Sequence, residues 1–468
     1  MTIRYVSTRA VPDPATGDGP EPLEFGDVLL AGLAPDGGLY CPTEVPALPE
    51  ITPDMSYADV AVAIFEPFVA PTFTAGELAD MAADAYRSFR DPLTCPVTEL
   101  EENRHLLDLT KGPTLAFKDV ALQMVAKLLE AELARRGETI TVIGATSGDT
   151  GSAAIEALAD RANIEVMILH PHNRVSEVQR RQMTTVGAAN IHNVAIEGTF
   201  DDCQDLVKAA FADEALRSEM NLAAVNSINW ARVMCQITYY VTAATAVSPD
   251  GGPVSFSVPT GNFGNVLSGW YAKRMGLNVD RLVVASNRND VLTRFFETGV
   301  LETQTVSPSL SPSMDIQISS NFERLLWESS GRDGRAITEL LAELRSTGRA
   351  EVPEPWYRKI LAEFDGDRLD DDGTLSGIAA HHSRTEQLVD PHTAVGLAAA
   401  DRLAKPDVPM VALATADPAK FPDAVERATG IRPDLPPHLG ELMTKPERCE
   451  TMANDLGPVA ERLRSFRS

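Results

Sequence analysis

The chain has 468 residues, of which 44% are hydrophobic and 23% are charged, which is ordinary for a globular protein with ample material for a core. Its formal net charge is -26 and its sequence pI is about 4.7. Nucleic acid and anionic membranes bind basic surfaces, so this charge argues against both as partners.

The five cysteines are far apart and include no C-x-x-C pair, so the sequence predicts neither a disulfide framework nor a zinc site. The amino-terminal residues lack the apolar segment of a signal peptide, and no apolar run is long enough to cross a bilayer. We therefore expect a cytoplasmic protein that binds no metal.

Residues 1–92 differ from the rest of the chain in composition and in the spacing of their apolar residues. The Pro/Gly-rich stretch APDGGLYCPTEVPALPEITPD is followed by YADVAVAIFEPFV and AGELADMAADAYRSF, which have helical spacing of apolar residues. We predict a mostly helical amino-terminal domain over this range.

From residue 93 the pattern becomes strand, glycine turn and helix, as in TITVIGA, IEVMILHP and NIHNVAIEG, the last of which leads into a helix predicted over DDCQDLVKAAFADEAL. The pattern returns in PVSFSV, RLVVASN and VPMVALATA. This alternation predicts an α/β core over 93–468 in which helices cover mostly parallel strands. We expect a smaller subdomain at roughly 140–245 and a larger one made of the remainder. The Ser/Pro/Thr-rich segment 302–320 predicts a long loop, either a lid or, as we favour, a plain surface connection.

The stretch GPTLAFKD ends an apolar run on Lys118, at the first turn of a predicted amphipathic helix. The positive end of the helix dipole and burial both disfavour the charged form of a lysine. Taken alone, the stretch favours a lysine that reaches solvent and pairs with Asp119. The alternative is an unprotonated amine that forms a Schiff base with a carbonyl.

Two glycine-containing turns each follow a predicted strand and precede a predicted helix. In the first glycine turn, GATSGDTGSAA over residues 144–154, backbone N–H groups and hydroxyls suit a small anion such as a carboxylate. The second glycine turn, PTGNFGN over residues 259–265, could bind a phosphate through backbone amides. The first turn has neither the spacing of a Walker loop nor that of a dinucleotide fingerprint.

Seven stretches in this order resemble the threonine synthase family, pyridoxal-phosphate enzymes of fold type II related to the tryptophan synthase β chain. They are LLAGLAPDGGLYCP, GPTLAFKD, TSGDTG, NSINWAR, PTGNFGN, SNFER and TADPAKF. The resemblance implies two open, mostly parallel α/β subdomains around a cleft, plus the helical amino-terminal domain.

The resemblance also implies the cofactor, pyridoxal 5'-phosphate, and its ligands. Lys118 would form the Schiff base and then act as the proton shuttle. Asp149 would lie beside the phenolic oxygen of the cofactor, and Thr415 would face its pyridine nitrogen. The cofactor phosphate would be bound by Gly261, Asn262, Phe263, Gly264 and Asn265.

The substrate implied by the resemblance is O-phospho-L-homoserine, which water converts to L-threonine and phosphate in the last step of threonine biosynthesis. The residues expected to bind its carboxylate are Thr146, Ser147, Gly148 and Thr150. Those expected to bind its phosphate are Lys111, Asn229 and Arg232. For Arg232, a surface ion pair is an equally good interpretation of the sequence. We expect a monomer or a homodimer.

Other activities stay open from the sequence alone. A threonine or serine dehydratase of the same fold would use Lys118 in the same way on a substrate with a hydroxyl leaving group. A catalytically silent binding protein could also keep this scaffold.

Overall fold

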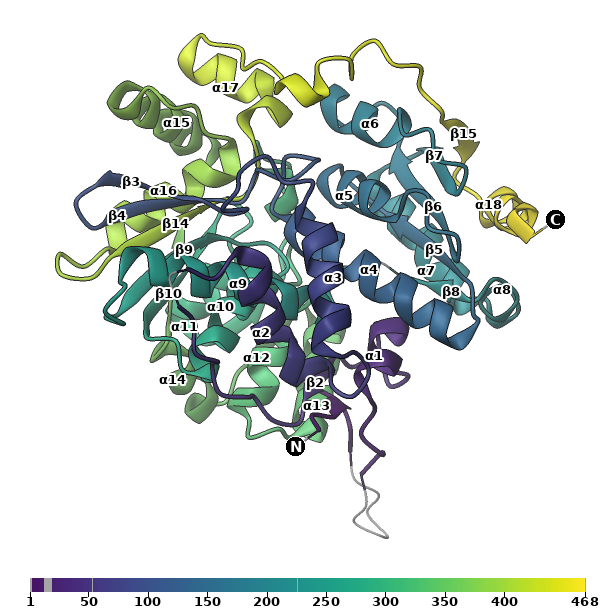
Figure 1. Ribbon diagram of the computed structural model, residues 1–468, viewed down its shortest axis with the longest axis horizontal. Helices are drawn as coiled ribbons and strands as arrows, with labels where there is room; N and C mark the ends of the chain where they lie inside the picture. The colour runs from purple at the N-terminus through teal and green to yellow at the C-terminus, as the bar shows by residue number, and fades with distance from the viewer. Residues whose placement is uncertain (1, 12–18, 53, 225, 468) are drawn as a thin grey trace. The chain divides into compact units, whose positions relative to one another are not determined.

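The computed structural model describes residues 2–11, 19–52, 54–224 and 226–467. By its internal contacts the chain divides into two units, and each unit is assembled from separate stretches of sequence. Unit 1 contains Met1–Lys111 and Ser227–Pro433, and unit 2 contains Gly112–Asn226 and Asp434–Ser468. Figure 1 labels most of the helices and strands of both units. The domain boundaries expected from the sequence, after residue 92 and around 140–245, stay a prediction.

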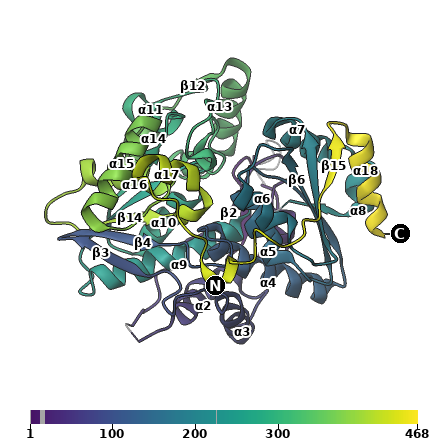
Figure 2. The same ribbon diagram turned by 90° about the horizontal axis from the view of Figure 1, so that it is seen from above.

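Unit 2 is built on a parallel sheet with the strand order β15-β7-β6-β5-β8. Its central strand β6 is buried along almost its whole length, as expected of a parallel strand covered on both faces. The strands are β5 (Ile140–Ala145), β6 (Ile164–Pro171), β7 (Ile191–Glu197), β8 (Leu222–Ala223) and β15 (Glu450–Ala453). Figure 2 shows β15 and the following helix, in yellow, at one edge of this sheet.

One predicted helix of unit 2 is divided into two helices in the structure. The stretch DDCQDLVKAAFADEAL, which reads as a single helix, is divided at Asp213, whose side chain accepts a hydrogen bond from the Leu216 N–H and begins a new helix. The helices are α4 (Lys118–Arg136), α5 (Asp149–Leu158), α6 (Glu177–Thr184), α7 (Phe200–Ala212), α8 (Glu214–Met220) and α18 (Leu456–Arg464).

Unit 1 has a larger sheet with the strand order β13-β10-β9-β14-β4-β3. All neighbours in it are parallel except β4 and β3, which pair antiparallel. The strands are β3 (Val97–Glu101), β4 (Arg104–Asp108), β9 (Val254–Pro259), β10 (Val279–Ser286), β13 (Phe364–Arg368) and β14 (Met410–Ala414). The predicted mixed α/β fold with mostly parallel sheets is confirmed.

The amino-terminal residues of unit 1 have helices as their longest regular elements, but fewer than half of the described residues among 1–92 are helical. They form α1 (Phe25–Ala31), α2 (Tyr57–Val69) and α3 (Ala75–Tyr86), beside the antiparallel pair β1 (Tyr5–Ser7) and β2 (Tyr40–Pro42). Capping boxes begin α2 at Ser56 and α3 at Thr74, because each hydroxyl and the acidic residue three positions later satisfy backbone N–H groups.

The remaining elements of unit 1 surround its sheet or extend from it. The helices are α9 (Trp230–Val247), α10 (Gly264–Met275), α11 (Val291–Thr298), α12 (Phe322–Ser329), α13 (Gly334–Thr347), α14 (Glu354–Leu361), α15 (Asp371–Thr385), α16 (Pro391–Leu403) and α17 (Pro422–Thr429). A short antiparallel pair consists of β11 (Val300–Glu302) and β12 (Arg349–Glu351). The single 3-10 turns of unit 1 are η1 (Pro312–Met314) and η2 (Pro418–Lys420). Those of unit 2 are η3 (Pro437–Leu439) and η4 (Ser465–Arg467).

Within the described ranges, no helix combines the length and the hydropathy that crossing a membrane requires.

Candidate functional site

Lys118 is a buried amine at the start of a helix in unit 2. It is the first residue of α4 and is only 8% exposed. Its Nζ lies 3.3 Å from Oδ2 of Asp149 and 4.7 Å from the centre of the Phe117 ring. The neighbouring Asp119 accepts hydrogen bonds from the N–H and the hydroxyl of Thr114, at 2.8 and 2.6 Å. The structure therefore gives Lys118 an ion pair with a residue distant in sequence.

Asp149, the partner of Lys118, is itself held in place. It is the first residue of α5, where a carboxylate is favoured by the helix dipole. Its Oδ1 accepts a hydrogen bond from Nε2 of Gln179 at 2.8 Å, while Oδ2 faces the lysine. Each carboxylate oxygen thus has a named donor, which fixes the orientation of Asp149.

The first glycine turn leads directly into α5. The Oγ1 atom of Thr146 accepts hydrogen bonds from the N–H groups of Gly148, at 3.0 Å, and Gly151, at 2.9 Å. A Cβ at Gly148, whose φ is +145°, would lie 2.4 Å from Gln179, and a Cβ at Gly151 would lie 2.4 Å from the Thr146 methyl group. Both glycines are therefore required by space, and Gly148 also by its backbone conformation.

The predicted residues of unit 2 thus lie together at the starts of α4 and α5. Thr146, Gly148 and Asp149 are buried, whereas Ser147 and Thr150 are half-buried. The structure brings the proposed Schiff-base lysine next to the predicted carboxylate-binding turn, through the contact between Lys118 and Asp149.

The second glycine turn lies in unit 1, between β9 and α10. Phe263 has a left-handed backbone with φ of +63°, and its ring is buried. A Cβ at Gly261 would lie 2.5 Å from the carbonyl oxygen of Ser313. Ser319 Oγ donates to the Gly261 carbonyl at 2.7 Å, and the Asn321 side chain donates to the Asn262 carbonyl at 2.9 Å. Residues 313–321 therefore pack directly on the turn.

Asn265 is the second residue of α10, and its side chain is oriented by two phenols. Its Oδ1 accepts from the hydroxyls of Tyr239, at 2.6 Å, and Tyr240, at 2.8 Å. Its Nδ2 is buried and has no hydrogen-bond partner within the part of the chain that the structure describes. Buried amide donors rarely stay unpaired in native proteins, so this group calls for an acceptor that the described residues do not supply.

Arg232 is a buried cation on α9, also in unit 1. It is 3% exposed, and its Nε and Nη1 have no hydrogen-bond partner among the described residues. Burial lowers the pKa of its guanidinium to about 10. The alternative of a surface ion pair for Arg232 is therefore wrong. Gln236, one turn further along α9, donates to the Arg232 carbonyl.

The other residues predicted to bind the substrate phosphate have structural contacts. Asn229 caps α9, since its Oδ1 accepts from the Ala231 N–H at 3.0 Å, and its Nδ2 donates to the Leu29 carbonyl at 2.9 Å. Lys111 forms a 2.8 Å ion pair with Asp108 and is partly exposed. Their roles as substrate ligands stay predictions.

Thr415 directly follows β14 and is 4% exposed. Its N–H donates to Thr393 Oγ1 at 3.3 Å, and Thr393 in turn is bonded to the buried Asp390. Thr415 therefore stands at the carboxyl end of a central parallel strand, where ligands bind in open α/β sheets.

Several side chains that orient these residues gave no signal in the sequence. Gln179 bonds Asp149 from 30 residues away, and Tyr239 bonds Asn265 from 26 residues away. Arg324, by contrast, belongs to the SNFER stretch that the sequence singles out; it is fully buried and donates to the carbonyls of Tyr40 and Ile228, so it anchors that stretch. Local spacing carries no information about such pairs.

Comparison with known proteins identifies the class of enzyme to which the chain belongs. The family model for pyridoxal-phosphate dependent enzymes matches residues 99–347, which include Lys118, both glycine turns and Arg232. The chain is a pyridoxal-phosphate-dependent enzyme of fold type II.

Two further models, threonine synthase N terminus and threonine synthase C-terminal, match residues 4–86 and 393–462. A threonine synthase from Pseudomonas aeruginosa is 48% identical, with 98% of this chain and 97% of that protein covered. The chain belongs to the threonine synthase family, whose members are pyridoxal-phosphate-dependent lyases.

Solved structures agree with this assignment. A crystal structure of PLP-bound threonine synthase from Brucella melitensis has a TM-score of 0.94 and 46% identity, covering 99% of both chains. Threonine synthase from yeast has a TM-score of 0.92 and 37% identity, covering 99% of this chain and 98% of the yeast chain.

Proposed function

We propose that this chain converts O-phospho-L-homoserine and water to L-threonine and phosphate, using pyridoxal 5'-phosphate. The observation that carries the proposal is the buried Lys118 amine at the start of α4, held on Asp149, in a chain whose relatives are named threonine synthase. A dehydratase would need the lysine as well, so the relatives decide between the two.

The residues of each unit fit the cofactor. In unit 2, Lys118 offers a buried amine for covalent attachment. In unit 1, the unpaired Nδ2 of Asn265 and the second glycine turn offer donors for a phosphate. We assign the phosphate to Gly261, Asn262, Phe263, Gly264 and Asn265. When bound, the cofactor supplies an electron sink for negative charge at the substrate carbons.

Lys118 has two duties in this proposal. It holds the cofactor between turnovers, and as a free amine it takes the proton from the α carbon of the substrate and returns protons further along the substrate. The Asp149 carboxylate, whose orientation Gln179 fixes, would lie beside the phenolic oxygen of the cofactor. Thr415 would place a neutral hydroxyl at the pyridine nitrogen, which leaves that nitrogen less firmly protonated than a carboxylate would.

Binding of a doubly anionic substrate must overcome the net charge of -26. We assign the substrate carboxylate to Thr146, Ser147, Gly148 and Thr150. We assign its phosphate first to Arg232, with Lys111 and Asn229 as further ligands. A buried guanidinium with unpaired N–H groups is costly to fold, and a phosphate would satisfy both its charge and its donors.

The deciding experiment supplies phosphohomoserine to the purified, cofactor-loaded chain and measures inorganic phosphate and threonine. We expect both products in equal amounts. The same enzyme incubated with threonine or serine should form little keto acid. Keto acid as the only product would overturn the proposal in favour of a dehydratase.

The role of Lys118 is tested separately with Lys118→Ala. This variant should lose turnover and the visible absorbance of the lysine-bound cofactor while its circular dichroism is unchanged. Lys127→Ala, on the same helix α4, is the matched control and should keep both. Full activity in Lys118→Ala would contradict the mechanism.

We also propose a cytoplasmic location, a monomeric or homodimeric state, and domain boundaries after residue 92 and around 140–245. The acidic composition and the absence of a C-x-x-C pair support the location. Light scattering of the purified chain would measure the oligomeric state.

A further inference from the structure

A buried aspartate–histidine pair lies at the start of α16 in unit 1. Nδ1 of His392 is 2.6 Å from Oδ2 of Asp390, and both residues are almost fully buried, at 3% and 0% exposure. Asp390 also accepts from the backbone N–H groups of His392, at 3.0 Å, and Thr393, at 2.9 Å. The aspartate is therefore fixed by the helix that it caps, and it fixes the ring of His392.

The other ring nitrogen of His392 contacts the segment before α12. Its Nε2 accepts a hydrogen bond from the backbone N–H of Ser313 at 3.2 Å. Because Nε2 is an acceptor, the ring proton resides on Nδ1 and is donated to Asp390. The histidine thus connects a rigid helix start to Ser313, which lies 79 residues earlier in the chain.

Ser313 in turn packs on the second glycine turn. Its carbonyl oxygen lies so close to Gly261 that a Cβ there would be only 2.5 Å away. Six residues later, Ser319 Oγ donates to the carbonyl of that same glycine at 2.7 Å. Ser313 and Ser319, both in the loop 302–320, therefore contact the backbone of Gly261 directly. The position of this loop sets the position of the second glycine turn.

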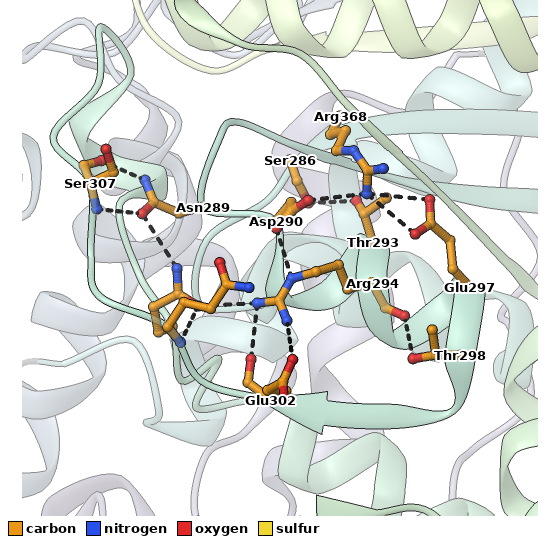
Figure 3. A network of polar contacts seen from close by, with 12 residues as sticks. Ser286, Asn289, Asp290, Thr293, Arg294, Glu297, Thr298, Glu302, Ser307 and Arg368 are labelled. Carbon is orange, nitrogen blue, oxygen red and sulfur yellow. Dashed lines mark hydrogen bonds and ion pairs between the residues drawn. The ribbon is translucent and has the colours of Figure 1, made fainter. Parts of the chain in front are cut away.

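The loop 302–320 is also held at its amino-terminal end, by Asn289 and Arg294. A mobile lid would lack such contacts. Figure 3 shows Asn289 exchanging two hydrogen bonds with the backbone of Ser307, both at 2.8 Å. The same view shows Arg294 donating to the carbonyl of Glu302 at 2.9 Å. Asp315 also accepts from Asn289, at 2.9 Å. These contacts make the loop a brace that has one defined position.

We propose that His392, oriented by Asp390, is a positioning residue for the cofactor phosphate. It holds Ser313, and through Ser313 it holds Gly261 and the amides of the second glycine turn in the geometry that a phosphate requires. The inference rests on the proposed phosphate-binding role of that turn. His392 acts through Ser313 and takes no part in the proton transfers.

Two amide substitutions separate the two bonds of the histidine ring. In His392→Gln, the side-chain carbonyl reaches the position of Nε2 and can still accept from the Ser313 N–H. In His392→Asn, the shorter side chain reaches only the position of Nδ1, so it can still bond Asp390 but no longer offers the Ser313 N–H an acceptor. If His392 mattered only through its bond to Asp390 at the helix start, His392→Asn, which keeps that bond, would have a smaller effect than His392→Gln.

The experiment titrates the full chain, stripped of cofactor, with pyridoxal phosphate and with pyridoxal, which lacks the phosphate. Absorbance of the lysine-bound aldehyde gives a dissociation constant for each, and the phosphorus resonance of the bound phosphate gives a second readout. The quantity compared is the preference for pyridoxal phosphate over pyridoxal. His381→Asn is the matched control, because His381 is buried in unit 1 and, within the described residues, neither of its ring nitrogens is bonded.

We expect His392→Asn to reduce this preference about 10- to 100-fold, because the hydrogen bond from the partly buried Ser313 N–H to the ring is lost and the turn is displaced. His392→Gln and His381→Asn should keep it. An unchanged preference in His392→Asn, equal losses for both ligands, or a larger loss in His392→Gln than in His392→Asn would overturn the inference. If the Asn variant does not fold, His392→Gln decides: a retained preference supports the inference and a lost one overturns it.

The same titration distinguishes this inference from the proposed function. A wild-type chain that binds both ligands equally would overturn the phosphate-binding role of the second glycine turn, and the positioning role with it. A wild-type preference that survives in His392→Asn would overturn the positioning role alone.

Discussion

The two glycine turns look alike in sequence, but the structure supports them in different ways. Each follows a buried parallel strand and begins a helix, β5 and α5 for the first and β9 and α10 for the second. The first turn is held largely by its own residues, since Thr146 bonds the amides of Gly148 and Gly151. The second is held by residues 313–321, more than fifty positions away.

This difference changes what each turn can offer a ligand. In the first turn, two of the backbone amides that suggested a carboxylate site already bond the Thr146 hydroxyl. That leaves hydroxyls and the remaining amides for the substrate. In the second turn, the carbonyls of Gly261 and Asn262 accept hydrogen bonds from side chains outside the turn, and the buried Nδ2 of Asn265 has no hydrogen-bond partner among the residues that the structure describes. A similar local pattern thus gives one turn that is capped by its own threonine and one that is supported by distant residues.

Gly261→Ala should have the largest effect, because the added Cβ would meet the Ser313 carbonyl, which is backbone and cannot rotate away. An overpacking cost of about 3 kcal/mol corresponds to a loss of roughly 150-fold in affinity for pyridoxal phosphate. Titration of the stripped chain measures it. The control is Gly264→Ala in the same turn, where the nearest atom is the Asn321 side-chain amide at 3.2 Å. Equal losses of affinity in both variants would contradict the inference that the loop 302–320 supports the second turn through Gly261.

Thr146→Val should weaken the first turn alone. The two amide N–H groups that donate hydrogen bonds to the hydroxyl would lose their acceptor, which costs about 1–3 kcal/mol of stability for a buried site. We expect a lower thermal midpoint and a raised KM for phosphohomoserine, while the preference for pyridoxal phosphate over pyridoxal is unchanged. Thr146→Ser keeps the hydroxyl and should behave as the wild type. A lost cofactor preference in Thr146→Val would show that the turns are not independent.

Tyr239→Phe should have a smaller effect on the second turn. It removes one of the two phenols that orient Asn265, and Tyr240 still bonds the same oxygen. One hydrogen bond of about 1 kcal/mol corresponds to roughly fivefold weaker binding of pyridoxal phosphate. Tyr86→Phe is the matched control, because within the described residues the hydroxyl of Tyr86 has no hydrogen-bond partner. A larger loss in the control would contradict the role of Tyr239.

The smallest effect should be a contribution to the pH dependence of stability from one histidine of unit 2, which carries the first turn. Burial lowers the pKa of His170, on β6, below its usual value of 6.5. The unfolded chain therefore binds a proton that the folded chain does not, so the free energy of unfolding falls as the pH drops below about 6.5. His170→Gln should flatten the fall in thermal midpoint between pH 7.5 and 5.5, whereas His172→Gln, at an exposed position, should not. A steeper fall in His170→Gln would contradict the sign of this prediction.

The sequence predicted the elements whose signals are local. The strand before the first glycine turn, the start of α4 at Lys118 and the helix after the second turn follow from apolar periodicity and glycine positions, which a short window contains. The same reasoning missed the break at Asp213, because an aspartate is tolerated in a helix as well as at its start.

The contacts between distant residues could not be predicted. Strand β15, Glu450–Ala453, is mostly exposed and lacks the apolar alternation of a strand, yet it extends the sheet of unit 2 by pairing with β7. Likewise, the bond from Ser313 to His392 spans 79 residues. A single sequence carries no record of which distant residues meet, so the supports of the two turns are visible only in the structure.

The path of the chain through its units also has a consequence for biosynthesis. Residues 434–468 return to unit 2 after the whole of 227–433 has been made. On the ribosome, the sheet of unit 2 would therefore lack its edge strand β15 until translation is nearly complete, and β7 would be open at that edge. Nascent chains stalled before residue 450 should accordingly be more prone to associate through β7 than chains released in full.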